Sequence, residues 1–303
     1  MDIAIMIEGQ NGLTWSRWQN LAAAVEDLGF AGLYRSDHFS NATPPDKESL
    51  ELWVSLTWLA SHTRRIEFGP LVSPLTYRHP VLTARMAAAV DDLSGGRLTL
   101  GLGAGWQERE HSMFGFDLLA LKPRFDRFEE GLEVITRLLK TQVPVSYEGQ
   151  YFRLHEAALL PPPLRLGGPR LLIGGNGEKR TMSLVAKYAD EWNAIFALPA
   201  ELSRLNTRMD GLLLAAGRQP SSLRRSMMTG LRFATTTKDL DAQLSARGQT
   251  VAELRQRGFI IGVGEEIKEQ LTELEKTGLQ RLMLQWLDLD DLQGLSALAK
   301  AVL

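Results

Sequence analysis

The feature that most constrains the fold is a repeated alternation of short apolar runs with longer amphipathic segments. This alternating pattern is typical of chains that fold as strand–helix units around a parallel sheet. Eight apolar runs predict strands, at residues 2–7, 31–36, 65–72, 97–103, 170–173, 191–196, 225–235 and 281–286. The amphipathic segments predict helices at residues 14–28, 50–61, 80 to the Gly95-Gly96 pair, 124–139, 181–188, 200–216, 265–276 and 291–302.

Further segments interrupt this pattern. Residues 106–114, 238–246 and 250–257 are expected to form short helices. Residues 143–159 are expected to be an extended excursion that turns at Glu148-Gly149.

No linker-like tract divides the chain, so the strand–helix units predict one (β/α)8 TIM barrel that spans residues 1–303, a fold that starts at roughly 250 residues. A doubly wound open sheet is the structural alternative, but its glycine fingerprint matches residues 8–12 poorly.

Composition excludes several classes of chemistry. The chain has no cysteine, which excludes disulfides, thiolate catalysis, thiolate zinc sites and iron–sulfur clusters. Its five histidines are scattered without HxH or HxxxH spacing, so no metal site is predicted. The net charge of −2 leaves no basic stripe for nucleic acid. No signal peptide and no long apolar run are visible, so we expect a cytoplasmic protein that acts on small molecules without membrane attachment.

The active site of such a barrel lies at the C-terminal ends of its strands. There the glycine-rich turn at residues 174–177, followed by Lys179 and Arg180, is the strongest signal. Glycine lets backbone N–H groups face a ligand, the next helix points its positive end there, and an arginine can hold a phosphate. The alternative is a tight turn that uses glycine for geometry alone. A second glycine stretch, Gly101 to Gly105, fits ligand contact and close packing equally well, and Trp106 after it is placed for a ring ligand.

Asp37 and His38 form the one carboxylate–imidazole pair at a strand end. Such a pair can move a proton near neutral pH. Adjacent residues at a strand end point in opposite directions, however, so direct contact between the two side chains is not assured. Prolines flank residues 71–73, and this rigid segment could carry a cis peptide. The residues Arg78-His79-Pro80 are interpreted as a helix entry.

Taken together, these motifs resemble the luciferase-like monooxygenase superfamily. The resemblance runs in order from the first strand to about Asn193 and continues weakly to the end. It is carried by Ser36-Asp37-His38-Phe39, Leu71-Val72-Ser73-Pro74 with residues 76–80, residues 94–98 running into 101–106, residues 124–130 and residues 173–180. The Gly-Ala-Gly-Trp and Gly-Gly-x-Gly-Glu-Lys-Arg stretches resemble most the branch that uses coenzyme F420.

The resemblance implies a reduced flavin or deazaflavin lying across the top of the barrel. It implies that the phosphate side lies at Gly174, Gly175, Asn176, Gly177 and Arg180, and that the ring rests on Leu71, Val72 and Ser73, where relatives often have a non-prolyl cis peptide. Asp37 and His38 would lie beside the ring with Ser36 in the same turn, and Gly103, Ala104, Gly105 and Trp106 would line the mouth. Some F420 relatives have an acid where this chain has Trp106, so Glu108 or Glu8 would replace it.

The leading functional hypothesis is therefore hydride transfer between F420 and a small organic substrate, with Asp37 and His38 handling the proton. The second is an FMN-dependent monooxygenase that receives reduced flavin from a partner reductase and uses oxygen. A non-catalytic flavin-binding paralogue is a third. A phosphosugar isomerase or aldolase would need a lysine or paired carboxylates at the strand ends, which this chain does not clearly show. The family resemblance also implies a homodimer.

Overall fold

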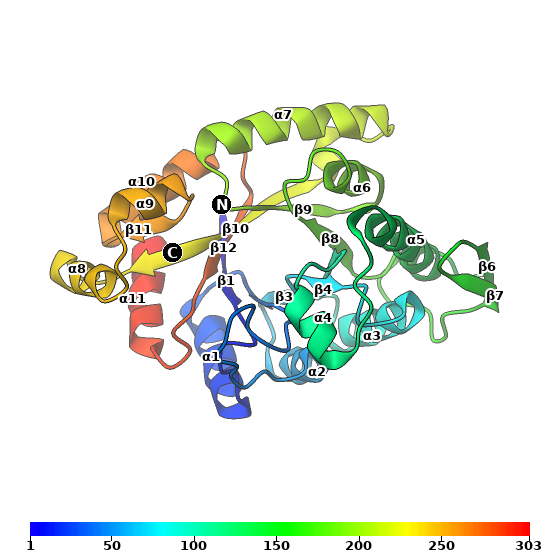
Figure 1. The fold of residues 1–303 in the computed structure, drawn as a ribbon, viewed down its shortest axis with the longest axis horizontal. Helices are drawn as coiled ribbons and strands as arrows, with labels where there is room; N and C mark the ends of the chain where they lie inside the picture. Colours follow the sequence, from blue (N-terminus) through cyan, green and yellow to red (C-terminus); the bar gives the residue numbers. More distant parts are fainter.

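A computed structural model describes residues 1–303, and its main sheet is a nearly closed barrel of parallel strands (Figure 1). A backbone hydrogen bond of 3.2 Å from Phe68 N to Arg97 O links β3 to the residues just before β5, so the ring of strands is nearly closed there. The barrel strands are β1 (Asp2–Ile7), β2 (Gly32–Arg35), β3 (Glu67–Pro70) with β4 (Ser73–Pro74), β5 (Thr99–Gly103), β8 (Arg170–Gly174), β9 (Glu191–Ile195), β10 (Arg224–Phe233) and β12 (Arg281–Gln285). The predicted (β/α)8 barrel is confirmed.

The helices that follow the strands form an outer layer around the barrel (Figure 1). Their ends follow ordinary capping chemistry: Thr14 accepts a hydrogen bond from Arg17 N, and Gly29 ends the same helix with a φ of 96° that favours glycine. His79 caps the third helix, with Pro80 in its first turn, as the sequence predicts. These helices are α1 (Trp15–Leu28), α2 (Leu52–His62), α3 (Pro80–Leu93), α5 (Leu121–Lys140), α6 (Thr181–Tyr188), α7 (Pro199–Ala215), α10 (Gly264–Glu275) and α11 (Leu292–Val302).

The interrupting segments are also structured. The excursion forms an antiparallel hairpin of β6 (Val145–Glu148) and β7 (Arg153–Ala157), turning after Glu148 as predicted. The short helices are α4 (Glu108–Phe114), α8 (Thr237–Ser245) and α9 (Val251–Gln256), with a 3-10 turn at Pro220–Ser222. The sequence pattern does not predict β11 (Ile260–Gly262), which pairs in parallel with the end of β10. A three-residue strand has too few positions to show a periodic pattern.

The third predicted strand, 65–72, is too long at both ends: β3 covers only Glu67–Pro70, and residues 71–72 lie outside any strand. The Leu71–Val72 peptide bond is cis, and after it the chain pairs again as the short strand β4. Inside the barrel a small apolar cluster gathers side chains from several strands: Ala4, Met6, Tyr34, Leu71, Leu172 and Met283. A far larger cluster of 64 buried residues lies mainly between the strands and the helices, so most of the apolar burial stabilises the outer layer rather than the barrel interior.

The N-terminal end of the barrel interior is filled by a buried charged group. Arg281 is 1% exposed and donates to Glu67 at 2.7 Å and to the Tyr34 hydroxyl at 2.5 Å, with Glu191 at 3.5 Å. Buried charges are tolerated when they are paired in this way. This end of the barrel is therefore closed by side chains, which leaves the opposite end for ligands. None of the helices combines the length and the apolarity needed to cross a lipid bilayer.

Candidate active site

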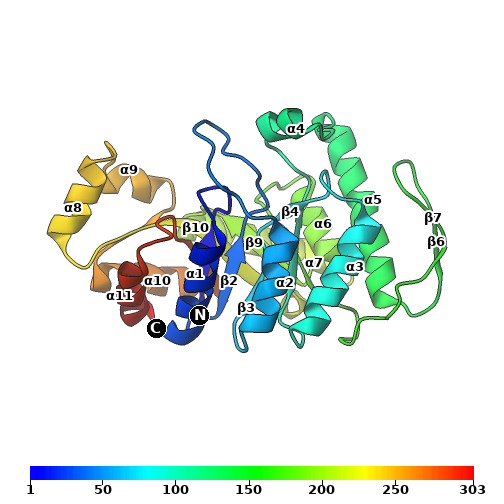
Figure 2. The ribbon, with the colours of Figure 1, turned by 90° about the horizontal axis from the view of Figure 1, so that it is seen from below.

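A cavity of about 510 Å³ lies at the C-terminal ends of the barrel strands. The segments after β1, β2 and β5 and the start of α5 surround it, and α4 stands over this end of the barrel, away from both chain termini (Figure 2). Its volume falls within the range of about 300–1,000 Å³ usual for small-molecule sites. Its lining combines apolar, glycine and titratable residues: Met6, Glu8, Ser36, Asp37, His38, Leu71, Val72, Pro74, Tyr77, Gly103, Ala104, Gly105, Trp106, Glu110, Leu121, Arg124, Phe125, Gly174, Asn193, Ile195 and Met228.

His38 is held at the cavity by a buried carboxylate on α4. Its Nδ1 lies 2.6 Å from Glu110 Oε1, and Glu110 is fully buried. The same carboxylate accepts hydrogen bonds from the Tyr77 hydroxyl and from Phe39 N, the latter at 3.0 Å. His38 Nε2 has no protein partner, and the side chain is 19% exposed. Glu110 therefore orients the imidazole and leaves its second nitrogen free for a ligand.

This contact also sets the protonation of the three groups. Burial disfavours the charged form of His38, but the hydrogen bond and charge of Glu110 outweigh it, so the pKa of His38 lies above its ordinary value. Burial likewise opposes ionisation of Glu110, yet His38 and the other donors keep its pKa below the usual range. Burial and the neighbouring Glu110 raise the pKa of Tyr77. The arrangement thus widens the pH range in which an imidazolium lies beside a carboxylate.

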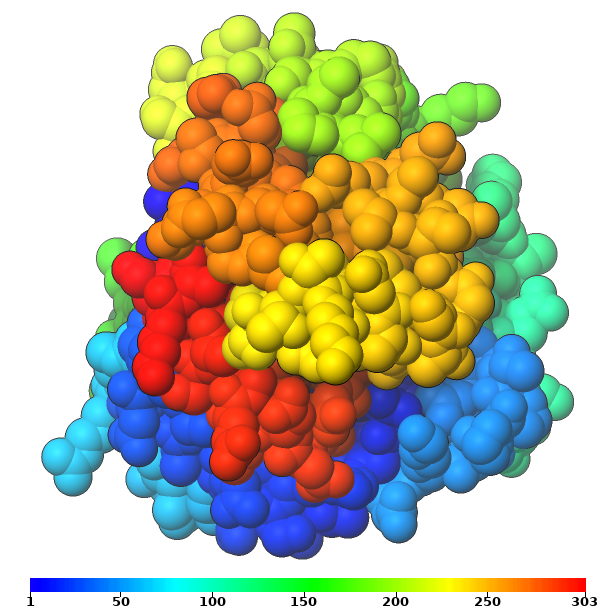
Figure 3. Space-filling view, turned by 90° about the vertical axis from the view of Figure 1, so that its left-hand side faces the viewer, coloured from blue at the N-terminus to red at the C-terminus, as the bar shows by residue number.

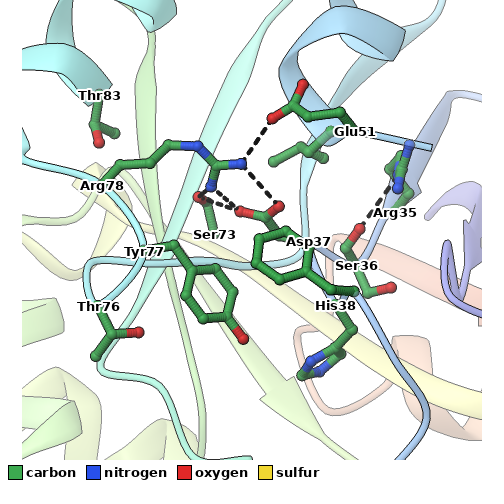
Figure 4. Close-up of polar contacts among 12 residues, drawn as sticks. Arg35, Ser36, Asp37, His38, Glu51, Ser73, Thr76, Tyr77, Arg78 and Thr83 are labelled. Carbon is green, nitrogen blue, oxygen red and sulfur yellow. Dashed lines mark hydrogen bonds and ion pairs between the residues drawn. The ribbon is translucent and has the colours of Figure 1, made fainter. Parts of the chain in front are cut away.

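Asp37 belongs to a separate network (Figure 4). Its carboxylate accepts a hydrogen bond from Ser73 Oγ at 2.7 Å and forms an ion pair with Arg78. Arg78 also donates to Glu51 Oε1 at 2.8 Å, at the beginning of α2. Asp37 is 2% exposed, so its charge depends on this partner. Asp37 and His38 therefore do not pair with each other, and Asp37 joins the end of β2 to β4 and α2.

A second polar chain crosses the cavity wall between β1, β2 and β12. Ser36 Oγ accepts from Gly9 N at 2.9 Å and donates to Gln10 Oε1 at 2.7 Å. Gln10 and Gln285 each donate to a different oxygen of Glu8, at 3.0 and 2.8 Å. Ser36 and Glu8 are thus fixed in position by neighbours before any ligand binds.

The cavity wall around Val72 depends on glycine. A Cβ on Gly103 would lie 2.7 Å from Val72 Cγ2, closer than side chains pack. A Cβ on Gly174 would lie 3.5 Å from Val72 Cγ1, an ordinary contact, so Gly174 could carry a methyl group that projects at the cavity. Glycine at position 103 therefore lets β5 approach the segment that carries the cis peptide, whereas packing against Val72 does not require glycine at position 174.

The glycine-rich turn before α6 lies at the edge of the cavity. The backbone N–H groups of residues 176–180 donate to no acceptor in the protein. Asn176 uses its side chain to tie this turn to β9, donating to Ile195 O at 2.8 Å and accepting from Ile195 N at 2.9 Å. Arg180 forms ion pairs with Asp126 at 2.8 Å and Glu129 at 3.6 Å. The free donors of this turn are therefore its backbone groups, while the Arg180 charge is shared with α5.

Most of the residues predicted for the site line the cavity: Ser36, Asp37, His38, Leu71, Val72, Gly103, Ala104, Gly105, Trp106 and Gly174. Trp106 is 62% exposed at the mouth and meets the His38 ring edge-on at 5.5 Å. Ser73 lies behind the wall on Asp37, and Gly175, Asn176, Gly177 and Arg180 lie beyond the lining.

The structure does not bring Glu108 to the cavity; it is exposed on α4, and Glu110 contributes the acid instead. Side chains two positions apart on an α-helix point about 200° away from each other, so Glu108 and Glu110 lie on opposite faces of α4. Gln107, Glu110 and His111 form the buried face of α4, but all three are polar, so no apolar period in the sequence marks this face. Tyr77 and Arg78 were also missed as site residues, because their partners are distant in sequence.

A family model described as luciferase-like monooxygenase matches residues 1–250. The chain belongs to this family. The chain is similar to 4-hydroxyprotoasukamycin monooxygenase of Streptomyces nodosus subsp. asukaensis, which is 34% identical over 177 residues, 58% of this chain and 46% of that protein. The F420-dependent hydroxymycolic acid dehydrogenase of Mycobacterium tuberculosis is 31% identical over 204 residues, 67% of this chain and 55% of that protein. The chain thus spans about half the length of these relatives.

Solved structures of low sequence identity share the fold. An F420-dependent secondary alcohol dehydrogenase in complex with an F420–acetone adduct has a TM-score of 0.87 at 18% identity, over 99% of this chain and 98% of that one. A type II Baeyer–Villiger monooxygenase from Pseudomonas putida in complex with FMN has a TM-score of 0.76 at 19% identity, over 100% of this chain and 98% of that one. The luciferase-like barrel thus includes structures with either cofactor.

Proposed function

We propose that this chain is an F420-dependent oxidoreductase that transfers a hydride between the deazaflavin and a small organic substrate. The observation that carries the proposal is the position of His38 in the cavity. Its Nδ1 is held by a buried carboxylate and its Nε2 is free. A proton donor and acceptor of this kind is what a hydride transfer to or from a carbon–oxygen bond requires.

The residues of the cavity fit a phosphorylated ring cofactor. Leu71, Val72 and Met228 give the cavity an apolar wall, on which a planar ring can pack. At its edge the turn of residues 176–180 offers unpaired backbone N–H groups beside the start of α6. Such donors at a helix N-terminus suit a phosphate group. We therefore propose that Leu71, Val72, Gly103, Ala104 and Gly105 hold the ring, with residues 174–177 at the phosphate.

The bound cofactor supplies the hydride chemistry, and the protein supplies position and proton transfer. As an imidazolium, His38 would donate its Nε2 proton to a substrate oxygen during reduction, and as a neutral imidazole its Nε2 would accept the proton of a substrate hydroxyl during oxidation. Glu110 keeps Nδ1 protonated and stabilises the imidazolium. Asp37 acts as a positioning residue that fixes the turn carrying His38 through Ser73 and Arg78. Trp106 contacts the imidazole edge-on at the mouth of the cavity.

An FMN-dependent monooxygenase that takes reduced flavin from a partner reductase is the second proposal, because the FMN complex of the Baeyer–Villiger enzyme shares this barrel. The two proposals are separated by titrating the purified protein with F420 and with FMN in both redox states and following cofactor fluorescence. We expect F420 to bind tighter. Tighter FMN binding supports the monooxygenase, and binding of neither cofactor contradicts both.

The role of His38 is tested by comparing Glu110→Gln with Glu108→Gln in the same titration and in turnover with secondary alcohols and ketones. The two variants make the same chemical change on one helix, but Glu110 alone contacts His38. We expect both variants to bind cofactor, and only Glu110→Gln to lose turnover. Equal turnover of the two variants contradicts the proposed role of His38.

A further inference from the structure

Glu8 is a carboxylate in the cavity wall that has no positively charged partner. It follows β1 directly and lines the cavity together with two other carboxylates. Those two are paired, Asp37 with Arg78 and Glu110 with His38. Glu8 takes part in no ion pair, and its carboxylate oxygens accept hydrogen bonds from neutral amides only. Its negative charge is therefore uncompensated within the protein.

Two glutamines hold this carboxylate in a fixed position. Gln10 donates to one oxygen at 3.0 Å and Gln285 donates to the other at 2.8 Å. Gln10 is 8% exposed, and its own amide oxygen accepts from Ser36 Oγ, so it cannot turn away without breaking a second hydrogen bond. Gln285 ends β12, which lies between β1 and β10, and the red segment that follows it packs directly against the yellow residues of α8 (Figure 3). The orientation of the carboxylate is thus set by the barrel itself.

The carboxylate of Glu8 can still accept a further donor. An ionised carboxylate only accepts hydrogen bonds, at about four sites, and the two amides occupy one site on each oxygen. Arg124 also lines the cavity without an ion pair, but it donates to Leu119 O at 2.8 Å and to Gly105 O at 3.1 Å rather than to Glu8. The free acceptor sites of Glu8 are therefore left for water or for a ligand that brings a donor.

Glu8 and His38 act on the same part of the cavity. Burial lowers the pKa of His38, the hydrogen bond and charge of Glu110 raise it, and the charge of Glu8 raises it further. Charges alter a pKa in this way when they lie close together. The side chains of Glu8 and His38 form no hydrogen bond with each other, so a small ligand that contacts His38 Nε2 can also offer a donor to Glu8.

We propose that Glu8 binds a second hydroxyl group of the substrate, which makes the substrate a diol or a hydroxy ketone. The reacting oxygen at His38 rests on the function proposed above, but recognition of the second hydroxyl does not depend on it. The hydroxyl donates to the carboxylate, and hydrogen bonds to a charged acceptor are about twice as strong as neutral ones. An ether oxygen at the same position is disfavoured, because an ionised carboxylate has no hydrogen to donate to it.

The test compares ligands that differ only in this donor. Cyclohexanol, the two cyclohexanediols with the second hydroxyl one or two carbons away, and the monomethyl ethers of these diols are titrated into the purified protein. Histidine ring resonances in NMR spectra report binding, since His38 lines the cavity and His62, exposed on α2, is the internal control. We expect at least one diol to bind about tenfold tighter than its ether and than cyclohexanol, the difference expected for one charged hydrogen bond. Equal binding of each diol and its ether overturns the proposal.

Variants assign the preference to Glu8. Glu8→Gln keeps the shape of the side chain and one oxygen that accepts hydrogen bonds, so we expect the preference for the diol to fall to about threefold, the value for a hydrogen bond of half the strength. Glu108→Gln makes the same change on an exposed residue outside the cavity and is expected to keep the preference of the wild type. An unchanged preference in Glu8→Gln overturns the proposal. If this variant does not fold, the comparison of diol and ether in the wild type still decides the question.

The same ligands separate this inference from the proposed function, because turnover with F420 is measured for each of them as well. Preferred binding of a diol over its ether, without oxidation of any of the ligands by F420, supports the role of Glu8 and counts against the proposed function. Oxidation of cyclohexanol, the diols and the ethers with equal kcat and KM supports the proposed function and contradicts the role of Glu8.

Discussion

Replacing Glu110 with glutamine tests the contact on which the site is built. The variant keeps the size of the side chain and one oxygen that can accept a hydrogen bond, but it removes the negative charge 2.6 Å from His38 Nδ1. Hydrogen bonds to charged groups contribute about 1.5–3 kcal/mol. We therefore expect the free energy of unfolding to fall by about 1.5–3 kcal/mol at slightly acidic pH, where both groups are ionised.

The pH dependence of this loss follows from the pKa of His38. Glu110 raises that pKa above the ordinary value of 6.5, so the stabilisation is complete below the pKa of unfolded histidine and is lost as pH rises through the folded-state pKa. Glu110 has a lowered pKa, so its contribution is also lost when strong acid protonates it. The difference between wild type and Glu110→Gln is therefore largest between these two pKa values and shrinks above the folded-state pKa of His38.

Urea denaturation at a series of pH values measures the difference, and NMR titration of the His38 ring measures its pKa directly. The pKa of His38 is expected to fall in the variant, because burial then acts against a weaker opposing charge. Glu108→Gln is the matched control and is expected to stay within about 0.5 kcal/mol of the wild type, as exposed substitutions do. An unchanged His38 pKa in Glu110→Gln would refute the reasoning, whatever the effect on stability.

Three other substitutions probe the surroundings of the cavity. Asp37→Asn removes the buried partner of an arginine and is expected to cost about 3–5 kcal/mol in urea denaturation, while shifting the pKa of His38 less than Glu110→Gln does. Gly174→Ala is expected to keep its thermal midpoint and to weaken cofactor binding in a fluorescence titration, whereas Gly101→Ala is expected to unfold because its methyl group would collide with Pro70 O. Asn176→Ala is expected to lose about 1–3 kcal/mol of stability and to weaken cofactor binding, because two hydrogen bonds to β9 are lost.

The sequence determined the architecture, because the pattern that encodes a strand–helix unit is local. The alternation of apolar and amphipathic segments located each of the eight strand–helix units of the barrel. Cap residues such as Thr14 and Gly29 marked helix ends within a few residues. The rule that barrel sites lie at strand ends then selected most of the residues that line the cavity. Very short strands were not predicted, because two or three residues are too few to show a period; β4 and β11 are the examples.

Only the tertiary structure decided which side chains meet. The sequence places Asp37 beside His38, yet one pairs with Arg78, 41 positions away, and the other with Glu110, 72 positions away. It gives no reason to prefer Glu110 over Glu108 without knowing which face of α4 is buried. The sequence likewise gives no sign that Arg232 and Arg257 both lie over the ring of Phe259. Periodicity records whether a residue faces the core, but the identity of its neighbour depends on how distant strands are brought together when the barrel closes.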